Sequence, residues 1–289
     1  MQYFNSKTDE IELNGQKYFV KRDDLLNTDF SGNKARKLHY FLDKDLSAYK
    51  KIISHGSNQS NAMYSISVLA RLKNLQFEYY TDHISSNLQV NPIGNYKEAL
   101  KNGMIVKLGK PKQSLEKDEL FVPEGGACKE SKYGLEVLAL EIEKWVSEKN
   151  IKNLIVFLPS GTGTTALYLQ HYLKFPVLTC SCVGDDSYLK KQFNMLENTK
   201  HPIIVAKPKK YHFGKLYKEL YLKHLELLEK TKIEFDLLYD SLGWIVFENH
   251  VKDLPNKNNY TFLYIHQGGA LGNITMLDRY RYKFTNILI

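Results

Sequence analysis

The sequence is poor in cysteine and has no long apolar run. Its 289 residues include three cysteines, which are too few for a disulfide framework and favour a reducing compartment. No stretch of about 18 apolar residues occurs, so we expect neither a membrane span nor a membrane partner. The N-terminal residues also lack the basic and then apolar pattern of a signal peptide, and we therefore expect a cytoplasmic location.

The sequence also lacks internal repeats and low-complexity segments. Hydrophobic residues account for 43% and charged residues for 25% of the chain, which excludes a disordered or collagen-like protein. The length is enough for a large buried core and, at about 150 residues per domain, suggests two domains.

The chain carries a formal net charge of +8, which fits a nucleic-acid or anionic small-molecule ligand but also a lysine-rich surface. The densest basic stretch, residues 207–210, is short and leads into a segment whose leucines share one helical face. The lysines of that segment, residues 215–228, lie largely off this face, as in an amphipathic helix with a solvated basic side. We therefore expect no nucleic-acid partner.

Short apolar runs alternate with helical patterns along the whole chain. The predicted strands lie at residues 51–54, 77–81, 104–108, 154–159, 177–183, 203–206 and 261–266. Helical spacing of apolar residues occurs between them and also over residues 31–46, ahead of the first strand. Such alternation predicts an α/β fold with two open, mostly parallel sheets, flanking helices and a cleft between the two domains.

The segment SGNKARK, residues 31–37, contains a candidate reactive amine. Gly32 and Asn33 are turn residues, and Lys34 opens the helix that follows. In a cleft at such a junction, loss of hydration and nearby positive charge lower the pKa of a lysine and free its amine as a nucleophile. The alternative is a surface lysine in the basic first turn of a helix.

Two loops that follow predicted strands are candidate ligand sites. The loop SHGSNQSN, residues 54–61, is rich in hydroxyl and amide side chains, and open α/β sheets bind ligands at such strand ends. The loop PSGTGTT, residues 159–165, combines two glycines, three threonines and a helix N-terminus, which is the composition of a phosphate cradle. It matches neither the Walker pattern nor the dinucleotide pattern. The alternatives are an ordinary polar loop with helix caps and a tight turn with a threonine cap.

Two further segments are weak signals when taken alone. LLYDSLG, residues 237–243, offers Tyr239 and Asp240, and IHQGG, residues 265–269, ends a predicted strand. The histidine of this strand end, His266, fits a hydrogen-bonded structural role better than a catalytic one. Cys180 and Cys182 would share one face of a strand, but they lack a second cysteine pair, so we expect core packing and no metal site.

Taken together and in this order, seven segments resemble the pyridoxal phosphate-dependent 1-aminocyclopropane-1-carboxylate (ACC) deaminase and D-cysteine desulfhydrase family. An early lysine, a polar loop soon after it and a late glycine and threonine loop are the core of the resemblance. The matching segments are residues 21–38, 56–61, 122–134, 159–167, 211–215, 235–240 and 265–272.

The resemblance implies a fold-type II (tryptophan synthase β-like) fold and a homodimer. It implies a large domain of residues 1–40 and 127–289, a small domain of residues 41–126, and pyridoxal 5′-phosphate in the cleft between them. Lys34 matches the lysine that forms an imine with this cofactor. Ser57 matches the serine beside the reacting carbon, and Tyr239 matches an active-site tyrosine in proton transfer or nucleophile activation.

The resemblance also implies roles for residues that bind ligands. Asn58 matches the asparagine that bonds the phenolic oxygen of the cofactor, and Asp240 matches the residue that faces its pyridine nitrogen. The matched phosphate loop consists of Ser160, Gly161, Thr162, Gly163 and Thr164. The expected substrate-binding residues are Ser57, Asn58, Gln59, Tyr211 and Gln267.

These matches predict a lyase or deaminase of a small amino acid. Asp240 is a carboxylate, like the glutamate of the deaminases, and favours ACC cleavage to 2-oxobutyrate and ammonia. Gln267, where deaminases have leucine and many desulfhydrases threonine, disfavours an apolar ring. We prefer D-cysteine desulfhydrase, which gives pyruvate, sulfide and ammonia, because β-elimination is the less demanding reaction. The altered Ser241 and Leu242 leave a non-catalytic cofactor-binding protein as an alternative of another class.

Overall fold

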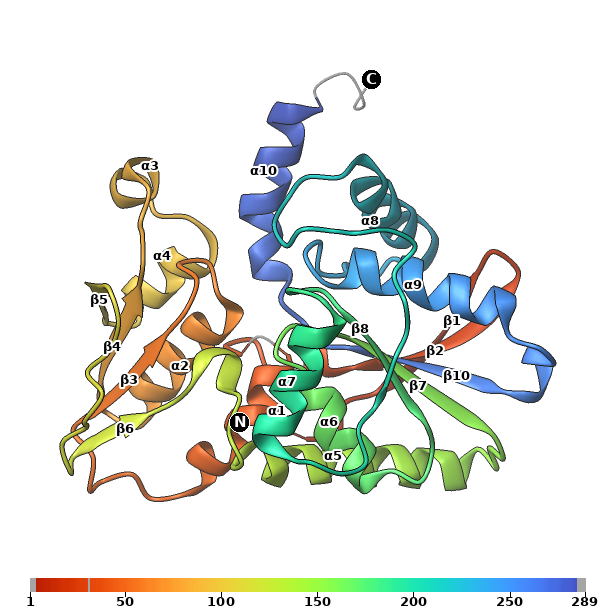
Figure 1. Ribbon diagram of the computed structural model, residues 1–289, viewed down its shortest axis with the longest axis horizontal. Coiled ribbons are helices and arrows are strands. Elements are labelled where there is room, and N and C mark those ends of the chain that lie inside the picture. The colour runs from red at the N-terminus through yellow and green to blue at the C-terminus, as the bar shows by residue number, and fades with distance from the viewer. Residues whose placement is uncertain (1–3, 31, 285–289) are drawn as a thin grey trace.

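The computed structural model describes residues 4–30 and 32–284, which form two sheets with helices around them (Figure 1). Ser31, at the start of the first predicted helical stretch, lies outside the described residues. The larger sheet has the strand order β1 (Thr8–Leu13), β2 (Gln16–Arg22), β10 (Thr261–His266), β7 (Leu154–Ser160), β8 (Val177–Ser181), β9 (Ile203–Ile204). The smaller sheet has the order β5 (Met104–Leu108), β4 (Gln76–Thr81), β3 (Lys51–His55), β6 (Glu119–Phe121).

Both sheets are mostly parallel, as the alternating pattern predicts. All pairs of the smaller sheet are parallel, and in the larger sheet the β1–β2 hairpin alone is antiparallel among the described strands. The turn of this hairpin is Asn14–Gly15, where both residues have positive φ. The central strand β7 is buried along its whole length, because helices cover both faces of a parallel sheet.

Helices cover both faces of the larger sheet, and others pack with the smaller one. Their bounds are α1 (Asn33–Asp43), α2 (Asn61–Leu72), α3 (Ser86–Val90), α4 (Gly94–Lys101), α5 (Ser131–Glu148), α6 (Thr164–Tyr172), α7 (Asp186–Leu196), α8 (Lys218–Thr231), α9 (Asp240–Asp253) and α10 (Asn273–Lys283). Apolar residues of α2 and α4 pack with the smaller sheet, whereas those of α5, α6 and α7 form one core against the larger sheet and those of α8 and α9 form another. Figure 1 shows α8 and α9 on the opposite side of the sheet from α5 and α6.

Helix α1 joins the two halves of the molecule. Ala35, Leu38 and Phe41 belong to the core of the smaller sheet, while the same helix packs along α5 of the larger one. It therefore crosses the domain boundary expected at residue 41, and the boundaries themselves stay a prediction. The reactive-lysine candidate Lys34 lies in the first turn of this joining helix.

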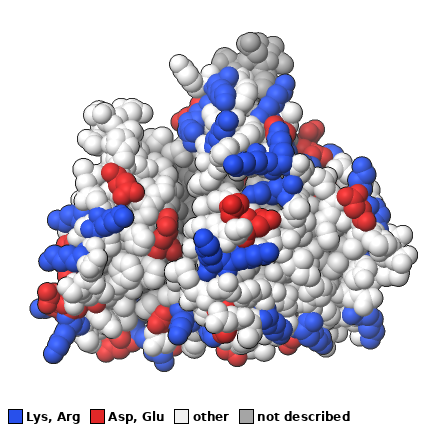
Figure 2. Space-filling view, in the orientation of Figure 1, with Lys and Arg blue, Asp and Glu red and all other residues white. Residues whose placement is uncertain are grey.

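Charge is distributed over the surface in both signs. Lysines and arginines are interspersed with acidic residues over the face shown in Figure 2. None of the helices in residues 4–30 and 32–284 combines the length and apolar character that a membrane crossing requires.

Candidate active site

A cavity of about 820 Å³ opens where loops from both sheets meet. The loops after β3, β7 and β10 line it, together with the first turns of α1 and α9 and one face of α10. Carboxyl ends of parallel strands are where open α/β folds bind ligands. Ligand cavities of about 300–1,000 Å³ hold drug-sized molecules, so this one has room for a cofactor and a small substrate.

Nearly all of the predicted site residues line this cavity. They are Lys34, Ser57, Asn58, Gln59, Ser160, Gly161, Thr162, Gly163, Thr164, Tyr239, Asp240 and Gln267. Residues from distant parts of the chain therefore meet at one place, which makes this cavity the candidate active site.

The amine of Lys34 is half-buried at the cavity wall. Its Nζ donates a hydrogen bond of 2.9 Å to Oδ1 of the neighbouring Asn33. Burial lowers the pKa of this amine to about 8, against an opposing attraction from Asp236. A substantial fraction of the amine is therefore neutral just above neutral pH, as a nucleophile or a base requires.

The loop after β7, for which the sequence predicts a phosphate cradle, lines the cavity. Gly163 is left-handed and precedes α6, so the N-terminus of this helix faces the cavity with its partial positive charge. The hydroxyls of Thr162 and Thr164 lie 3.0 Å apart within the loop. The hydroxyl of Ser160 instead pairs with Thr179 of β8 at 2.7 Å, which leaves the two threonines as the hydroxyl donors of the cradle.

Lys37 is a site residue that the sequence reasoning missed. Its buried Nζ donates to the carbonyl oxygen of Gly125 at 3.0 Å and lies 3.5 Å from Oγ1 of Thr162. Burial, and then repulsion from Lys34, holds its pKa well below the usual range. The signal was present in the spacing, because residues three apart on a helix share a face. A cation beside the cradle would strengthen its attraction for a phosphate.

The polar loop after β3 lies opposite the cradle. The carbonyl oxygen of Ser57 accepts a hydrogen bond of 2.9 Å from the buried Tyr79, and its hydroxyl accepts one from the backbone N–H of Gln59. The Asn58 amide donates to the carbonyl of His83 at 2.7 Å. Ser60 caps α2 by accepting from two backbone N–H groups. The loop therefore presents hydroxyl and amide groups to the cavity from a fixed backbone.

Tyr239 and Asp240 stand at the start of α9. Burial, and then repulsion from the buried Asp236, raises the pKa of the Tyr239 hydroxyl far above neutral pH, so this hydroxyl keeps its proton. Burial, and then repulsion from Asp236, also raises the pKa of the Asp240 carboxyl well above its usual range. The Tyr239 hydroxyl is therefore a proton donor at the cavity wall, and the Asp240 carboxyl binds a proton more readily than a solvated carboxyl does.

Asp236 is a second residue that the sequence reasoning missed. Its Oδ1 accepts the backbone N–H of Tyr239 at 2.6 Å, while its buried Oδ2 has no hydrogen-bond partner among the residues that the structure describes. Burial raises the pKa of this carboxyl to about 7. Its charge acts on both Lys34 and Asp240, so its protonation state influences the whole site.

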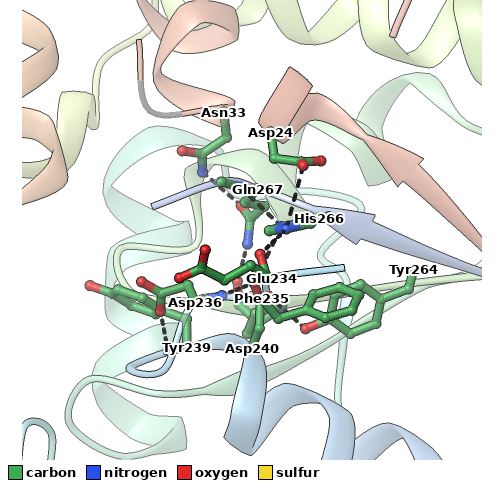
Figure 3. A network of polar contacts seen from close by, with 12 residues as sticks. Asp24, Asn33, Glu234, Phe235, Asp236, Tyr239, Asp240, Tyr264, His266 and Gln267 are labelled. Carbon is green, nitrogen blue, oxygen red and sulfur yellow. Dashed lines mark hydrogen bonds and ion pairs between the residues drawn. The ribbon is translucent and has the colours of Figure 1, made fainter. Parts of the chain in front are cut away.

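His266 is a structural residue, as its position at a strand end predicts. Its buried Nε2 donates to the carbonyl of Glu234 at 3.0 Å, and its Nδ1 accepts the backbone N–H of Gly268 at 3.2 Å. Burial lowers its pKa, so the ring is neutral. Figure 3 shows the ring between Asp24 and the buried carboxyl of Asp240, whose Oδ2 lies 3.4 Å from Nδ1.

Tyr211 requires a correction, because the structure does not place it on the cavity. Its side chain is buried in the core of the larger sheet, where its ring packs edge-on against Tyr217 with centroids 4.9 Å apart. Burial, and then repulsion from Glu219, raises the pKa of its hydroxyl to about 12. The substrate-binding role predicted for Tyr211 is therefore replaced by a packing role.

The cysteines and the acidic residues form no metal centre in the described part of the chain. No group of three or more histidine, cysteine or acidic side chains gathers there in a geometry that could hold a metal ion. The sulfurs of Cys180 and Cys182 lie 4.0 Å apart in the core, where both side chains are buried.

Comparison with known proteins supports the fold. The sequence matches no protein-family model and no curated protein. Among solved structures it is similar to an ACC deaminase homologue, with 20% identity, a TM-score of 0.76, and coverage of 96% of this chain and 93% of that chain.

Two other solved structures are similar over nearly their whole length. A threonine deaminase from T.th. shares 13% identity over 92% of each chain, with a TM-score of 0.64. A hydrogen sulfide-producing enzyme from Fusobacterium nucleatum shares 12% identity over 94% of this chain and 97% of that chain, with a TM-score of 0.62. The chain therefore has the fold-type II, tryptophan synthase β-like architecture that its sequence predicts.

Proposed function

We propose that this chain is a pyridoxal phosphate-dependent lyase that releases ammonia from a small amino acid, with D-cysteine as the preferred substrate. The observation that carries the proposal is the Lys34 amine, half-buried with a pKa of about 8, in the same cavity as a phosphate cradle. The proposed small-molecule partner is therefore the amino acid itself.

The residues present fit the cofactor. The N-terminus of α6, the hydroxyls of Thr162 and Thr164 and the amine of Lys37 would hold its phosphate. Lys34 would hold its aldehyde carbon, and the carboxyl of Asp240 would face its ring nitrogen. Asn58 would reach its phenolic oxygen after release of the His83 carbonyl.

The bound cofactor would supply an electron sink for the substrate, and the protein supplies the proton transfers. Once the amine of the substrate has taken the place of Lys34 at the aldehyde carbon, the freed, neutral Lys34 amine would take the proton from Cα of D-cysteine. The thiolate leaves Cβ with its bonding electron pair, and addition of water then releases ammonia and pyruvate. Tyr239, which keeps its proton, is the donor at the cavity wall, and the buried carboxyl of Asp240 would face the ring nitrogen.

One observation favours ACC deaminase as a second candidate. Asp240 is a buried carboxyl at the position expected against the ring nitrogen, where an ionised carboxylate would keep that nitrogen protonated and so deepen the electron sink. ACC has no proton on Cα, so its ring must open by attack of a nucleophile or by removal of a methylene proton. Ser57 is the candidate nucleophile, because the raised pKa of Tyr239 makes that hydroxyl a donor.

Similar structures support the class of reaction in general terms. Their names describe two deaminases or deaminase homologues and a hydrogen sulfide-producing enzyme, so ammonia and sulfide release both occur on this fold. A homodimer in the cytoplasm, without nucleic-acid or membrane partners, completes the proposal.

A keto-acid assay on the full chain loaded with pyridoxal phosphate tests the proposal. D-cysteine and ACC are supplied in parallel, with Lys34→Ala as the inactive control and Lys252→Ala as an exposed-lysine control. Pyruvate and sulfide in equal amounts from D-cysteine support the desulfhydrase, and 2-oxobutyrate from ACC supports the deaminase instead. A yellow protein whose absorbance responds to neither amino acid, and which forms no product, would be a cofactor-binding protein without turnover.

A further inference from the structure

We propose that Gln267 is a positioning residue for the Lys34 amine and that it acts through the side-chain amide of Asn33. The inference deepens the proposed function, because it concerns the amine that would hold the cofactor. It rests on three consecutive hydrogen bonds that connect the end of β7, the end of β10 and the start of α1.

The first two hydrogen bonds hold both ends of the Gln267 amide. Its Nε2 donates to the carbonyl oxygen of Pro159 at 2.7 Å, and its Oε1 accepts from Nδ2 of Asn33 at 2.7 Å. Figure 3 shows the Asn33 and Gln267 side chains directed toward one another. The third hydrogen bond joins Oδ1 of Asn33 to Nζ of Lys34 at 2.9 Å.

The carbonyl of Pro159 fixes the direction of all three hydrogen bonds. The carbonyl of Pro159 can accept a hydrogen bond but cannot donate one, so it selects the NH₂ end of Gln267. The oxygen end of Gln267 must then face Asn33, and it selects the NH₂ end of that amide in turn. As a result the oxygen of Asn33 faces the Lys34 amine, where the reverse orientation would set N–H against N–H.

The backbone on both sides of these hydrogen bonds is also constrained. The N–H of Asn33 donates to the carbonyl oxygen of Gln267 at 2.8 Å, which joins α1 to the end of β10. Gly32 has a positive φ, and a Cβ at this position would overlap that same carbonyl oxygen. The two amides therefore meet across a junction that leaves them little freedom to move.

This arrangement has a chemical consequence for Lys34. An amine that donates one N–H to Asn33 directs its lone pair and its remaining N–H bonds elsewhere. The acceptor favours the protonated amine, as the charge of Asp236 does, whereas burial and the charge of Lys37 oppose protonation. The acceptor therefore limits how far burial can lower the pKa of Lys34. An apolar side chain at position 267 would leave Nδ2 of Asn33 with only the long 3.4 Å contact to Oγ1 of Thr165. The Asn33 amide could then turn about its own side-chain bonds, and the protonated amine of Lys34 would lose its acceptor.

The test measures how the reactivity of Lys34 depends on pH in the full chain, freed of carbonyl ligands by dialysis against hydroxylamine. Trinitrobenzenesulfonate modifies neutral amines, and mass spectrometry follows the peptide that contains Lys34. The quantity compared is the pH at which modification of Lys34 is half-maximal, called the midpoint below. In Gln267→Met, which keeps the size of the side chain, we expect this midpoint to fall by roughly half a pH unit. At pH 7 that corresponds to about a threefold faster modification of Lys34. Gln267→Leu should change the midpoint in the same direction.

A double-mutant comparison tests whether Gln267 acts through Asn33. Asn33→Ala should lower the midpoint by itself, and adding Gln267→Met to it should cause no further change. The matched control is Gln170→Leu, which removes a buried glutamine that also bridges two backbone groups but lies outside the cavity. It should destabilise the protein and leave the midpoint of Lys34 unchanged.

Two results would overturn the inference. The first is an unchanged midpoint in both Gln267 variants, and the second is an additive effect in the double variant. Because the reaction needs no cofactor, either result can be obtained whether or not the chain binds pyridoxal phosphate. Conversely, a protein that follows the predicted midpoints but binds no pyridoxal phosphate would support the positioning role and contradict the proposed function.

Discussion

The hydroxyl of Tyr264 donates a hydrogen bond of 2.7 Å to Oδ1 of Asp240, and both side chains are fully buried. The other oxygen of Asp240 accepts the backbone N–H of Asp236 at 3.0 Å. Two protein donors therefore hold the carboxyl that would face the ring nitrogen of the cofactor. Each donor favours the ionised form, in opposition to the burial that raises the pKa of Asp240.

Removal of the tyrosine hydroxyl should affect stability and protonation together. In Tyr264→Phe, Oδ1 of Asp240 loses its donor, so the pKa of this carboxyl should rise further. The free energy of unfolding should fall by about 1–3 kcal/mol, the typical cost of an unpaired buried polar group. Urea denaturation measures this loss, with Tyr282→Phe, on an exposed ring, as the control. An unchanged stability would contradict the role assigned to this hydrogen bond.

The buried Asp236 should make stability depend on pH. Its pKa is about 7 in the folded protein and near 3.8 in the unfolded chain, so the folded state binds more protons between these values. Stability from this group is therefore greatest at low pH and falls as the pH rises toward 7, by on the order of 1.4 kcal/mol per pH unit. Asp236→Asn should remove this decrease, as measured by urea denaturation at several pH values.

The matched control for this experiment is Asp185→Asn. Asp185 accepts a backbone N–H at the start of α7 in the same way, but it is exposed to solvent. Its substitution should leave the pH dependence of stability as in the unaltered protein. If the free energy of unfolding depends on pH in the same way in Asp236→Asn and in the unaltered protein, the pKa of Asp236 is not raised by folding.

The buried amine of Lys37 should lower the stability of the ligand-free protein but strengthen its binding of phosphate. Its pKa is held well below the usual range, which means that burial of its charge destabilises the ligand-free protein. Lys37→Met should therefore increase the thermal midpoint of the ligand-free chain. It should also weaken pyridoxal phosphate binding by about 10- to 100-fold, the effect of losing a charged hydrogen bond.

Fluorescence titration with pyridoxal phosphate checks the binding half of this prediction. The exposed Lys129 supplies the control variant Lys129→Met, which should change neither quantity. A variant of Lys37 that binds the cofactor normally would contradict a role for this amine in holding the phosphate.

A buried ion network ties the N-terminal strands to α5. Glu141 accepts from Arg36 at 2.6 and 2.9 Å and lies 2.7 Å from Nζ of Lys21, with all three side chains nearly excluded from solvent. Arg36 also pairs with the buried Asp23 at 2.8 Å, so Glu141→Gln leaves the buried Lys21 as the cation with a neutral partner. The substitution should destabilise the protein by about 3–5 kcal/mol. The exposed pair of Lys144 and Glu148 is the control, and Glu148→Gln should cost less than about 0.5 kcal/mol.

Much of the fold follows from hydrophobic patterning. The strand predicted at residues 261–266 has the same limits in the structure, because a buried parallel strand is a short apolar run between turns. The strand predicted at residues 104–108 also keeps its limits, although it lies at the edge of the smaller sheet and is largely exposed. The β1–β2 hairpin was not predicted, although Asn14–Gly15 is a strong hairpin signal. Its strands lie near one end of the chain and outside the βα alternation on which the prediction relied.

The candidate site was less predictable than the fold. Motifs named Lys34 and the glycine and threonine loop because these segments occur together and in order along the chain, although each alone also fits an ordinary turn or helix start. Asp236 could not be recognised, since its importance comes from burial and from an oxygen without a partner among the described residues. Tyr211 was assigned by resemblance, but packing of its ring in the core decides its role.

Gln267 shows how a substitution can change meaning once the structure is known. In the sequence it is a polar residue where an apolar substrate ring would pack. In the structure both ends of its amide are held by protein groups, and its position explains the orientation of Asn33. Sequence patterns report residue types, whereas the direction of an amide depends on partners that lie far away in the chain.

The central claim is that the Lys34 amine binds pyridoxal phosphate. The most direct test is to incubate the full chain with pyridoxal phosphate, reduce with borohydride and locate the attached pyridoxyl group by peptide mass spectrometry. We predict near-stoichiometric attachment to Lys34, and its loss in Lys34→Ala but not in Lys252→Ala. Attachment spread over exposed lysines, with Lys34 unmodified, would contradict the account.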